Sequence, residues 1–188
     1  MPQRPPAPGF EDLLDSARTH ALHLEFRDVD AVGEGEEREV FEAFLRDGSV
    51  PADDSEYWSG WLPLVQRTVA RGVQVCRARV VSEPVTDYVR FEHAITDANF
   101  RAGEQVRWLP RRRASALAPP GNDFWLIDDR LVRWNIFSGD GQALDPTTPT
   151  TPPRSSCAWR RSARCGTWPS TTPTTASDRR ATQGPRTS

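Results

Sequence analysis

The chain has 188 residues, a formal net charge of −2, 27% charged residues and 37% hydrophobic residues, which fits one soluble domain. It contains no stretch of 18 apolar residues, no collagen-like repeat and no excess of basic residues. A membrane span, a fibrous protein and a basic protein that coats nucleic acids are therefore excluded. The proline-rich start lacks a basic segment followed by an apolar one, so we expect a cytoplasmic protein without a membrane partner.

The three cysteines, Cys76, Cys157 and Cys165, form no Cys-x-x-Cys pair. Because their number is odd and their spacing matches no common ligand set, the sequence predicts neither a disulfide framework nor a zinc site. Cys76 lies in an apolar segment and is expected to be a small buried hydrophobic residue. We expect no cofactor.

The first predicted elements are a helix and a strand. Residues 10–18 place their apolar side chains on one helical face. In the segment 21–27, apolar and polar residues alternate, which predicts a half-buried strand with His23, Glu25 and Arg27 on the solvent side.

Two helices and the clearest strand follow. Residues 34–46 and 57–71 carry apolar side chains at helical spacing, although Pro63 limits the regular part of the second helix. Gly72 is a natural helix terminator. The segment 73–81 is rich in β-branched residues and predicts a strand.

The next segment predicts two helices and a short strand. Ser82 is expected to cap a helix with Pro84 just inside it, and residues 96–103 predict a further short helix. Residues 106–111 predict a strand that Pro110 confines to an edge or a strand end.

A hairpin completes the predicted domain. The apolar segments 123–128 and 131–137 flank Asp129 and Arg130, which predicts two strands joined by a tight turn. We expect an α/β or α+β domain over residues 10–142, with a single small mixed sheet, flanking helices and this late hairpin.

The two ends of the chain differ from this domain. We expect residues 1–9 and 143–188 to be disordered. Of the 43 residues in the segment 146–188, 31 are Thr, Ser, Pro or Arg, and none is Val, Ile, Leu, Met, Phe or Tyr. This segment has 7 Arg and 1 Asp, a charge of +6, whereas residues 1–145 have 17 Arg and 25 acidic residues, a charge of −8. An acidic domain argues against direct nucleic-acid binding.

If Arg is encoded by CGN and Ser by TCN, a reading frame shifted by one base is compatible with an acidic Asp-Asp-Pro turn from residues 146–153 and with an amphipathic helix from residues 155–169. We therefore hypothesise that a frameshift near Ala143 to Pro146 replaced the original C-terminal helix. The alternative is a genuine disordered Thr/Pro tail.

The densest group of polar residues predicts a candidate ligand site. Its members follow the predicted Ser82 cap and continue through the edge strand: Arg90, Glu92, His93, Glu104, Arg107 and Arg111, with Arg112 and Arg113 beside them. The planar guanidinium group of arginine can donate two parallel hydrogen bonds to the oxygens of a phosphate group, which favours an anion pocket. The alternative is a network of Arg–carboxylate pairs that fixes a helix on the sheet.

Other residue groups have simpler interpretations. His20 and His23 lack a third ligand nearby, so we expect no metal site. The aspartates Asp123, Asp128, Asp129 and Asp140 could form a carboxylate cluster for a divalent ion, but the simpler interpretation is that they are turn residues. Tryptophans interleave with arginines, but the acidic charge favours core or interface packing over stacking on nucleic-acid bases.

The run from Arg71 to Gly141, which contains RGVQVCRARVVSEP at 71–84 and GNDFWLIDDRLVRWNIFSGDG at 121–141, resembles a known family, and the resemblance extends back to about Phe10 through LLDSARTHALHLEFRD. It is similar to an uncharacterised actinobacterial domain family that is often encoded beside a helix-turn-helix (XRE-type) regulator. The resemblance implies a non-catalytic regulatory or partner-binding module that acts with such a regulator.

A weaker resemblance is to one half of a phospholipase-D-like domain. It implies the alternative function, a phosphate-ligand-binding or phosphodiesterase-like enzyme that uses the Arg/Glu/His group. The position of the His-x-Lys signature is occupied by Gly121, Asn122, Asp123 and Phe124, so the imidazole nucleophile and the cationic phosphate clamp of that chemistry are missing there.

Overall fold

The computed structural model describes residues 9–29, 35–115, 121–139, 142–144 and 150–151. Twelve elements follow one another along these residues: α1 (Phe10–Asp15), β1 (His20–Glu25), α2 (Glu36–Asp47), the 3-10 helix η1 (Glu56–Trp58), α3 (Trp61–Ala70), β2 (Gln74–Val81), α4 (Asp87–Ala94), α5 (Thr96–Ala102), β3 (Gln105–Pro110), α6 (Arg111–Ala114), β4 (Asp123–Ile127) and β5 (Leu131–Asn135).

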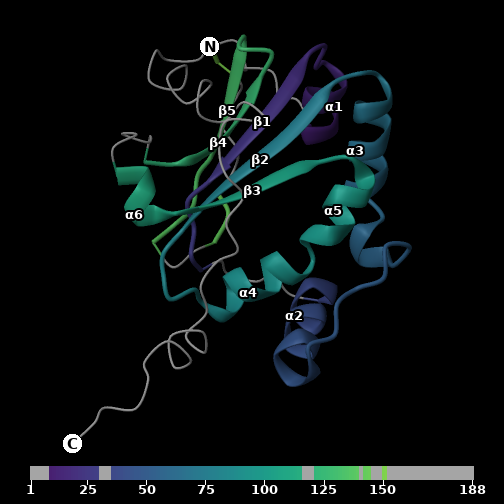
Figure 1. Cartoon of the computed structure of the whole chain (residues 1–188). Coiled ribbons are helices and arrows are strands. Elements are labelled where there is room, and N and C mark those ends of the chain that lie inside the picture. The colour runs from purple at the N-terminus through teal and green to yellow at the C-terminus, as the bar shows by residue number, and fades with distance from the viewer. Residues whose placement is uncertain (1–8, 30–34, 116–120, 140–141, 145–149, 152–188) are drawn as a thin grey trace, which may run out of the picture.

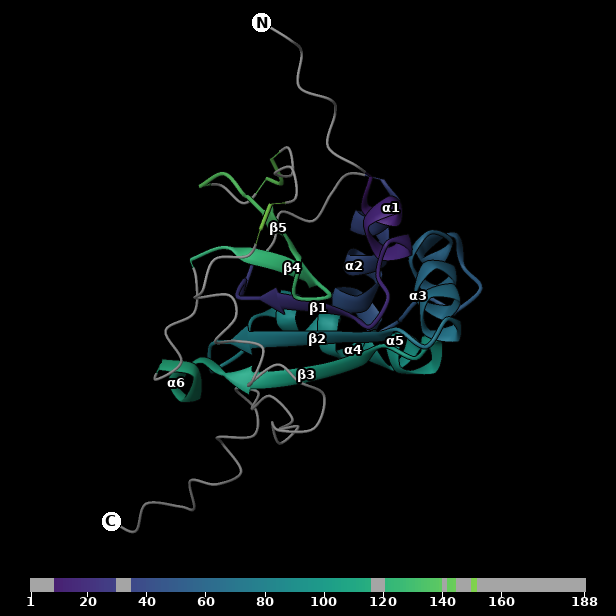
Figure 2. The same ribbon diagram turned by 90° about the horizontal axis from the view of Figure 1, so that it is seen from above.

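The strands form one five-stranded mixed sheet in the order β3-β2-β1-β4-β5, as Figures 1 and 2 show. β1, β2 and β3 are parallel neighbours, whereas β4 pairs antiparallel with both β1 and β5. Helical segments connect the parallel strands, because parallel neighbours require a crossover. The predicted fold class, a small mixed sheet with flanking helices and a late hairpin, is confirmed.

The two faces of the sheet bury different side chains. On one face, Leu24, Ala78, Leu126 and other apolar residues form a cluster to which α6 contributes Ala114. On the other face, α1 and α3 pack on Val75, Trp125 and neighbouring residues. Side chains alternate between faces along each strand, so the polar residues of β1 and β2 that alternate with the first cluster point toward the helices.

The expectation that His23 and Glu25 face solvent is wrong. His23 is buried, and the Glu25 side chain is 17% exposed. The reason is that β1 is the middle strand of the sheet, and its polar face lies under the helices. A half-buried strand and a central strand can carry the same alternating pattern.

The boundary of α4 also differs from the prediction. Thr86, not Ser82, caps the helix, and its side chain accepts a hydrogen bond from the Val89 amide at 3.2 Å. The Ser82 amide and hydroxyl instead donate to Asp28 at 2.6 and 2.7 Å. Pro110 ends the edge strand β3, as its sequence position predicts.

The C-terminus of α5 depends on one glycine. Gly103 adopts a φ of 96°, and a Cβ atom there would lie 3.0 Å from a methyl group of Val69. This position therefore requires both the conformational freedom and the small size of glycine. The left-handed turn directs the next residue, Glu104, into the interior, where it is 1% exposed.

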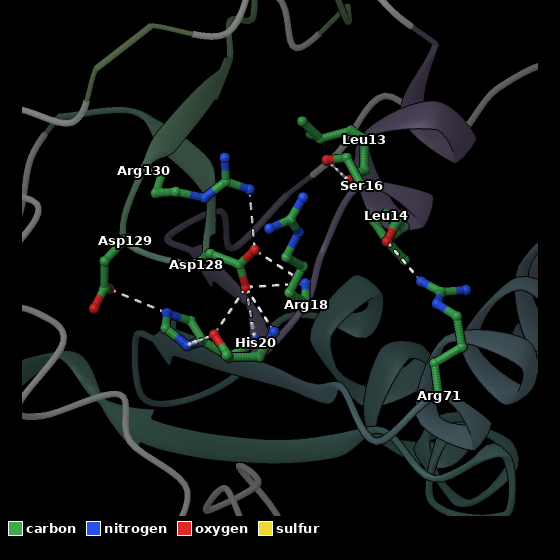
Figure 3. A network of polar contacts seen from close by, with 10 residues as sticks. Leu13, Leu14, Ser16, Arg18, His20, Arg71, Asp128, Asp129 and Arg130 are labelled. Carbon is green, nitrogen blue, oxygen red and sulfur yellow. Dashed lines mark hydrogen bonds and ion pairs between the residues drawn. The ribbon is translucent and has the colours of Figure 1, made fainter.

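Asp128 joins the hairpin to the start of β1 (Figure 3). Its carboxylate accepts hydrogen bonds from the amides of Arg18, Thr19 and His20 at 2.9, 2.8 and 3.1 Å, and from the Thr19 hydroxyl at 2.8 Å. Burial acts to raise the pKa of Asp128, but these hydrogen bonds outweigh it and lower the pKa. Asp128 and Asp129 have φ values of 48° and 61°, so the two aspartates are the central residues of the turn.

Cys76 differs from its prediction in one respect. It is buried on β2, as expected for a small hydrophobic residue. It is also disulfide-bonded, whereas the sequence predicts no disulfide framework. The other two cysteines lie outside the described residues.

Part of the predicted tail pairs with the domain. Ala143 forms an isolated bridge with Phe137, and Thr150 forms one with Val132 of β5. The predicted disordered N-terminus up to residue 8 and the tail beyond residue 151 lie outside the described residues, and the frameshift remains a prediction. Over the described segments, no helix is long and apolar enough to cross a bilayer.

We predict that Asp128→Asn lowers the free energy of unfolding by about 1 to 3 kcal/mol at pH 7, because a neutral amide accepts weaker hydrogen bonds. Asparagine tolerates the left-handed backbone, so the turn is retained. The lowered pKa means that the carboxylate stabilises the fold above the ordinary aspartate pKa of about 3.9 and that this contribution is lost below it.

Denaturant titrations at several pH values test this prediction. The difference between wild type and Asp128→Asn should be constant near neutrality and narrow below about pH 4. Asp129→Asn is the matched control, because its carboxylate contacts the His20 ring at 3.1 Å instead of the three amides. A difference that does not change with pH would contradict the assigned role of Asp128.

Candidate functional site

A buried ion network lies between the sheet and the helices. Its centre is Arg77 on β2, whose guanidinium lies 2.8 Å from Glu25 and 2.7 Å from Glu104. The Arg77 side chain is 12% exposed and that of Glu104 is fully buried. The register of the strands explains this proximity. On β2, Cys76 pairs with Gln105 and Arg79 pairs with Glu25, so Arg77 is one residue from the first of these positions and two residues from the second.

Arg79 extends the network toward α4. Its Nε atom lies 2.8 Å from Oε2 of Glu25, and its terminal nitrogen pairs with Glu92. Asn99 of α5 donates to the second oxygen of Glu104. The network therefore joins two strands and two helices.

The network has more negative than positive groups. Three carboxylates, Glu25, Glu92 and Glu104, meet two guanidinium groups, those of Arg77 and Arg79, which leaves a charge of −1. The two arginines lower the pKa of Glu25 to about 2 against the opposing effect of its burial, so this carboxylate is ionised at neutral pH. A buried charge excess of this kind attracts a positive group.

His23 borders the network and is neutral at pH 7. Its Nδ1 lies 3.1 Å from Glu25, and its ring stacks on Trp125 with 4.2 Å between centroids. Burial lowers the pKa of His23 to about 3, although the charge of Glu25 acts in the opposite direction. Protonation would place a buried positive charge near those of Arg77 and Arg79, which is costly.

A cleft of about 450 Å³ opens above this network. Arg77, Arg79 and Glu25 form its floor, and Glu92 and residues of α3 and α5 contribute to its walls. Glu36 and Glu37, in the first turn of α2, are exposed and line its rim. A volume of this size lies within the range of about 300 to 1,000 Å³ that small-ligand sites occupy.

Four aromatic side chains also line the cleft: Tyr57, Trp58, Trp61 and Tyr88. The Arg77 guanidinium lies 5.2 Å from the centroid of the Trp61 ring. The indole Nε1 atoms of Trp58 and Trp61 are buried and have no hydrogen-bond partner among the described residues. Burial, followed by the negative charges of Glu92 and Glu37, raises the pKa of Tyr57, so its hydroxyl stays protonated.

The structure separates the predicted ligand residues. Glu92 and Glu104 belong to the buried network, as the alternative interpretation expected. Arg90 is exposed and pairs with Asp87 at 3.1 Å. The His93 ring lies 5.3 Å from that of Trp108, and burial lowers the pKa of His93.

The predicted arginines of β3 and α6 lie elsewhere. Arg107 is the register partner of Ala78, so it projects from the opposite face to Arg77. Arg111 donates to Asp28, Ser82 and the Val80 carbonyl at 3.0, 2.9 and 3.2 Å. Arg112 pairs with Glu83 at 3.1 Å, and Arg113 is exposed. Arg111 thus attaches α6 and the loop after β1 to the sheet, and none of these four arginines lines the cleft.

Sequence analysis missed the centre of the site. Arg77 and Arg79 alternate with apolar residues in the segment 73–81, which the sequence already predicts to be a strand because it is rich in β-branched residues. Charged residues on one face of such a strand, together with Glu25 on the first strand, were the available signal. Within the described ranges, no group of three or more His, Cys, Asp or Glu side chains is placed to hold a metal ion.

The fold and cleft define a mixed-sheet domain with a charged, aromatic-lined pocket between sheet and helices. The family model for DUF6879, a domain of unknown function, matches residues 8–174. The chain belongs to the DUF6879 family.

Other comparisons are more distant. No curated protein sequence matches the chain. Among solved structures, the chain is similar to that of TrmBL2, an archaeal chromatin protein described as showing a novel mode of DNA binding. The sequences are 10% identical, the TM-score is 0.38, and the match covers 81% of this chain and 44% of that chain. The chain thus spans less than half the length of that protein.

We predict that His23→Gln makes the stability of the domain less dependent on pH. The pKa of His23 is about 3 in the folded state and about 6.5 in the unfolded chain. Only the unfolded state gains a proton below about pH 6.5, so wild-type stability falls by about 2 kcal/mol between pH 7 and pH 5 because of this residue.

Denaturant titrations of wild type and His23→Gln at these two pH values measure this loss. His23→Gln should lack most of this loss of stability between pH 7 and pH 5. His93→Gln is the control and should remove less of the pH dependence, because His93 is more exposed than the buried His23. Equal pH dependence in wild type and His23→Gln would show that His23 is not held neutral.

Proposed function

We propose that this chain is a non-catalytic regulatory module that binds a protein partner through the cleft and acts with a helix-turn-helix transcriptional regulator. The observation that supports it most is the state of the charged groups in the cleft. Arg77 and Arg79 are each held between two carboxylates, which fixes their positions. Groups held in this way suit recognition by a preformed surface.

The surroundings of the cleft favour a protein partner. Exposed glutamates at the rim and aromatic side chains in the walls are the combination found at interaction surfaces, where aromatic residues supply most of the binding energy. The charge of −8 over residues 1–145 argues against direct binding of nucleic acid. The partner is the regulator that the resemblance to the actinobacterial family implies.

The alternative function is that of a phosphate-ligand-binding or phosphodiesterase-like enzyme, based on the resemblance to half of a phospholipase-D-like domain. The geometry gives it less support, because Arg90, Arg107 and Arg111 project from three different parts of the domain. A thermal-shift screen with nucleotides and phosphosugars tests it. Stabilisation that is lost in Arg107→Ala would favour this alternative.

We predict that the full chain forms a complex with the helix-turn-helix regulator encoded beside it, and that Tyr88→Ala weakens this complex by at least about tenfold. Tyr88 lines the cleft and packs edge-on against Phe41, 6.5 Å between ring centroids. Size-exclusion chromatography and calorimetric titration measure the complex.

Phe100→Ala is the matched control. It removes an aromatic side chain that is 49% exposed on α5 and does not line the cleft, so binding should be unchanged. The proposed function is wrong if the wild-type chain does not bind the regulator. The assignment of the cleft is wrong if both variants bind as well as wild type.

A further inference from the structure

We propose that the cleft binds the cationic side chain of an arginine or lysine in a basic peptide segment of the partner. This inference rests on the proposed function and adds the chemistry that the cleft recognises. The charge balance, the aromatic walls and the indole N–H groups that lack a partner within the described segments each support it.

The charge balance favours a cation. Four glutamates and two arginines line the cleft, a charge of −2. Glu104, which also pairs with Arg77, brings the total to −3. Each arginine already contacts two carboxylates, so an anionic ligand would have to displace one of them. An incoming guanidinium or ammonium group needs no such displacement and reduces the excess negative charge.

The aromatic walls suit the same kind of group. Cations bind over the faces of tryptophan and tyrosine rings within about 6 Å of the centroid. Trp61 already has the Arg77 guanidinium at 5.2 Å. Tyr57 and Tyr88 line the cleft together with Glu92 and Glu37, so a cation bound there would lie close to both aromatic rings and carboxylates.

The indole groups favour a peptide over a free cation. Trp58 is 5% exposed, and its Nε1 lacks a hydrogen-bond partner among the described residues, as does that of Trp61. An N–H group can only donate, and a buried donor without a partner costs free energy. A peptide supplies carbonyl acceptors next to its cationic side chain, whereas a simple ammonium or guanidinium ion supplies none.

Tryptophan fluorescence titrations with defined probes test the proposal on the full chain. The probe is acetyl-Gly-Arg-Gly-amide, and its matched control is the same peptide with citrulline, a neutral isostere of arginine. The arginine peptide should bind at least about tenfold more tightly than the citrulline peptide. Methylguanidinium should bind more weakly than the arginine peptide, and inorganic phosphate should not saturate.

Rim variants locate the binding site. Glu36→Gln/Glu37→Gln should weaken binding of the arginine peptide at least about fivefold, because two partly exposed ion pairs are removed. Glu39→Gln/Glu42→Gln is the control. It removes the same charge from exposed positions of α2 outside the cleft, and Glu39 shares the acidic first turn. This control should bind within about twofold of wild type.

The outcomes separate this proposal from the proposed function. Equal binding of the arginine and citrulline peptides, equal loss in both double variants, or tighter binding of methylguanidinium or of phosphate would overturn the basic-peptide proposal. If the regulator complex forms but the arginine peptide does not compete with it, the proposal fails while the proposed function stands. If the regulator does not bind but the arginine peptide does, the cleft chemistry is correct and the partner is wrong.

Discussion

The pairing of Arg77 with Glu25 and Glu104 is the interaction on which the site depends. It joins the central strand β1, its neighbour β2 and the residue that precedes β3, all on the face that the helices cover. Removing one partner from such a buried group leaves an uncompensated charge and costs about 3 to 5 kcal/mol. The strands and helices around the cleft are therefore held in one arrangement by polar contacts as well as by apolar packing.

The two faces of the sheet bury different kinds of side chain. One face is an apolar cluster of Leu24, Val80, Leu126 and similar residues, which is an ordinary core. The other face buries charge beneath α3, α4 and α5, and a cleft opens there. Burial of ionised groups is expensive when an apolar core would serve the fold as well. The proposed binding function would account for this cost.

Much of the fold could be predicted from the sequence. The apolar periodicity of residues 57–71 and the β-branched segment 73–81 gave elements close to α3 and β2, and Pro110 was correctly confined to the end of an edge strand. Local patterns determine such elements. The burial of both sides of β1 was not predictable, because His23 and Glu25 have the same alternation in a central strand as in a half-exposed one.

The site was less predictable than the fold. Sequence proximity grouped Arg90, Arg107 and Arg111, but the register of β3 and the position of α6 separate them. Glu25 lies 52 residues from Arg77 in sequence, and only strand pairing brings them together. Glu92 and Glu104 were identified, and the interpretation that placed them in an Arg–carboxylate network describes their contacts.

The most direct test of this account is a double-mutant cycle between Arg77→Met and Glu104→Gln, read as the free energy of unfolding. The account predicts that each single variant is strongly destabilised and that the second change recovers part of the loss, with a coupling of about 2 to 3 kcal/mol. A coupling below about 1 kcal/mol, the value typical of surface pairs, would show that the network does not hold the site together.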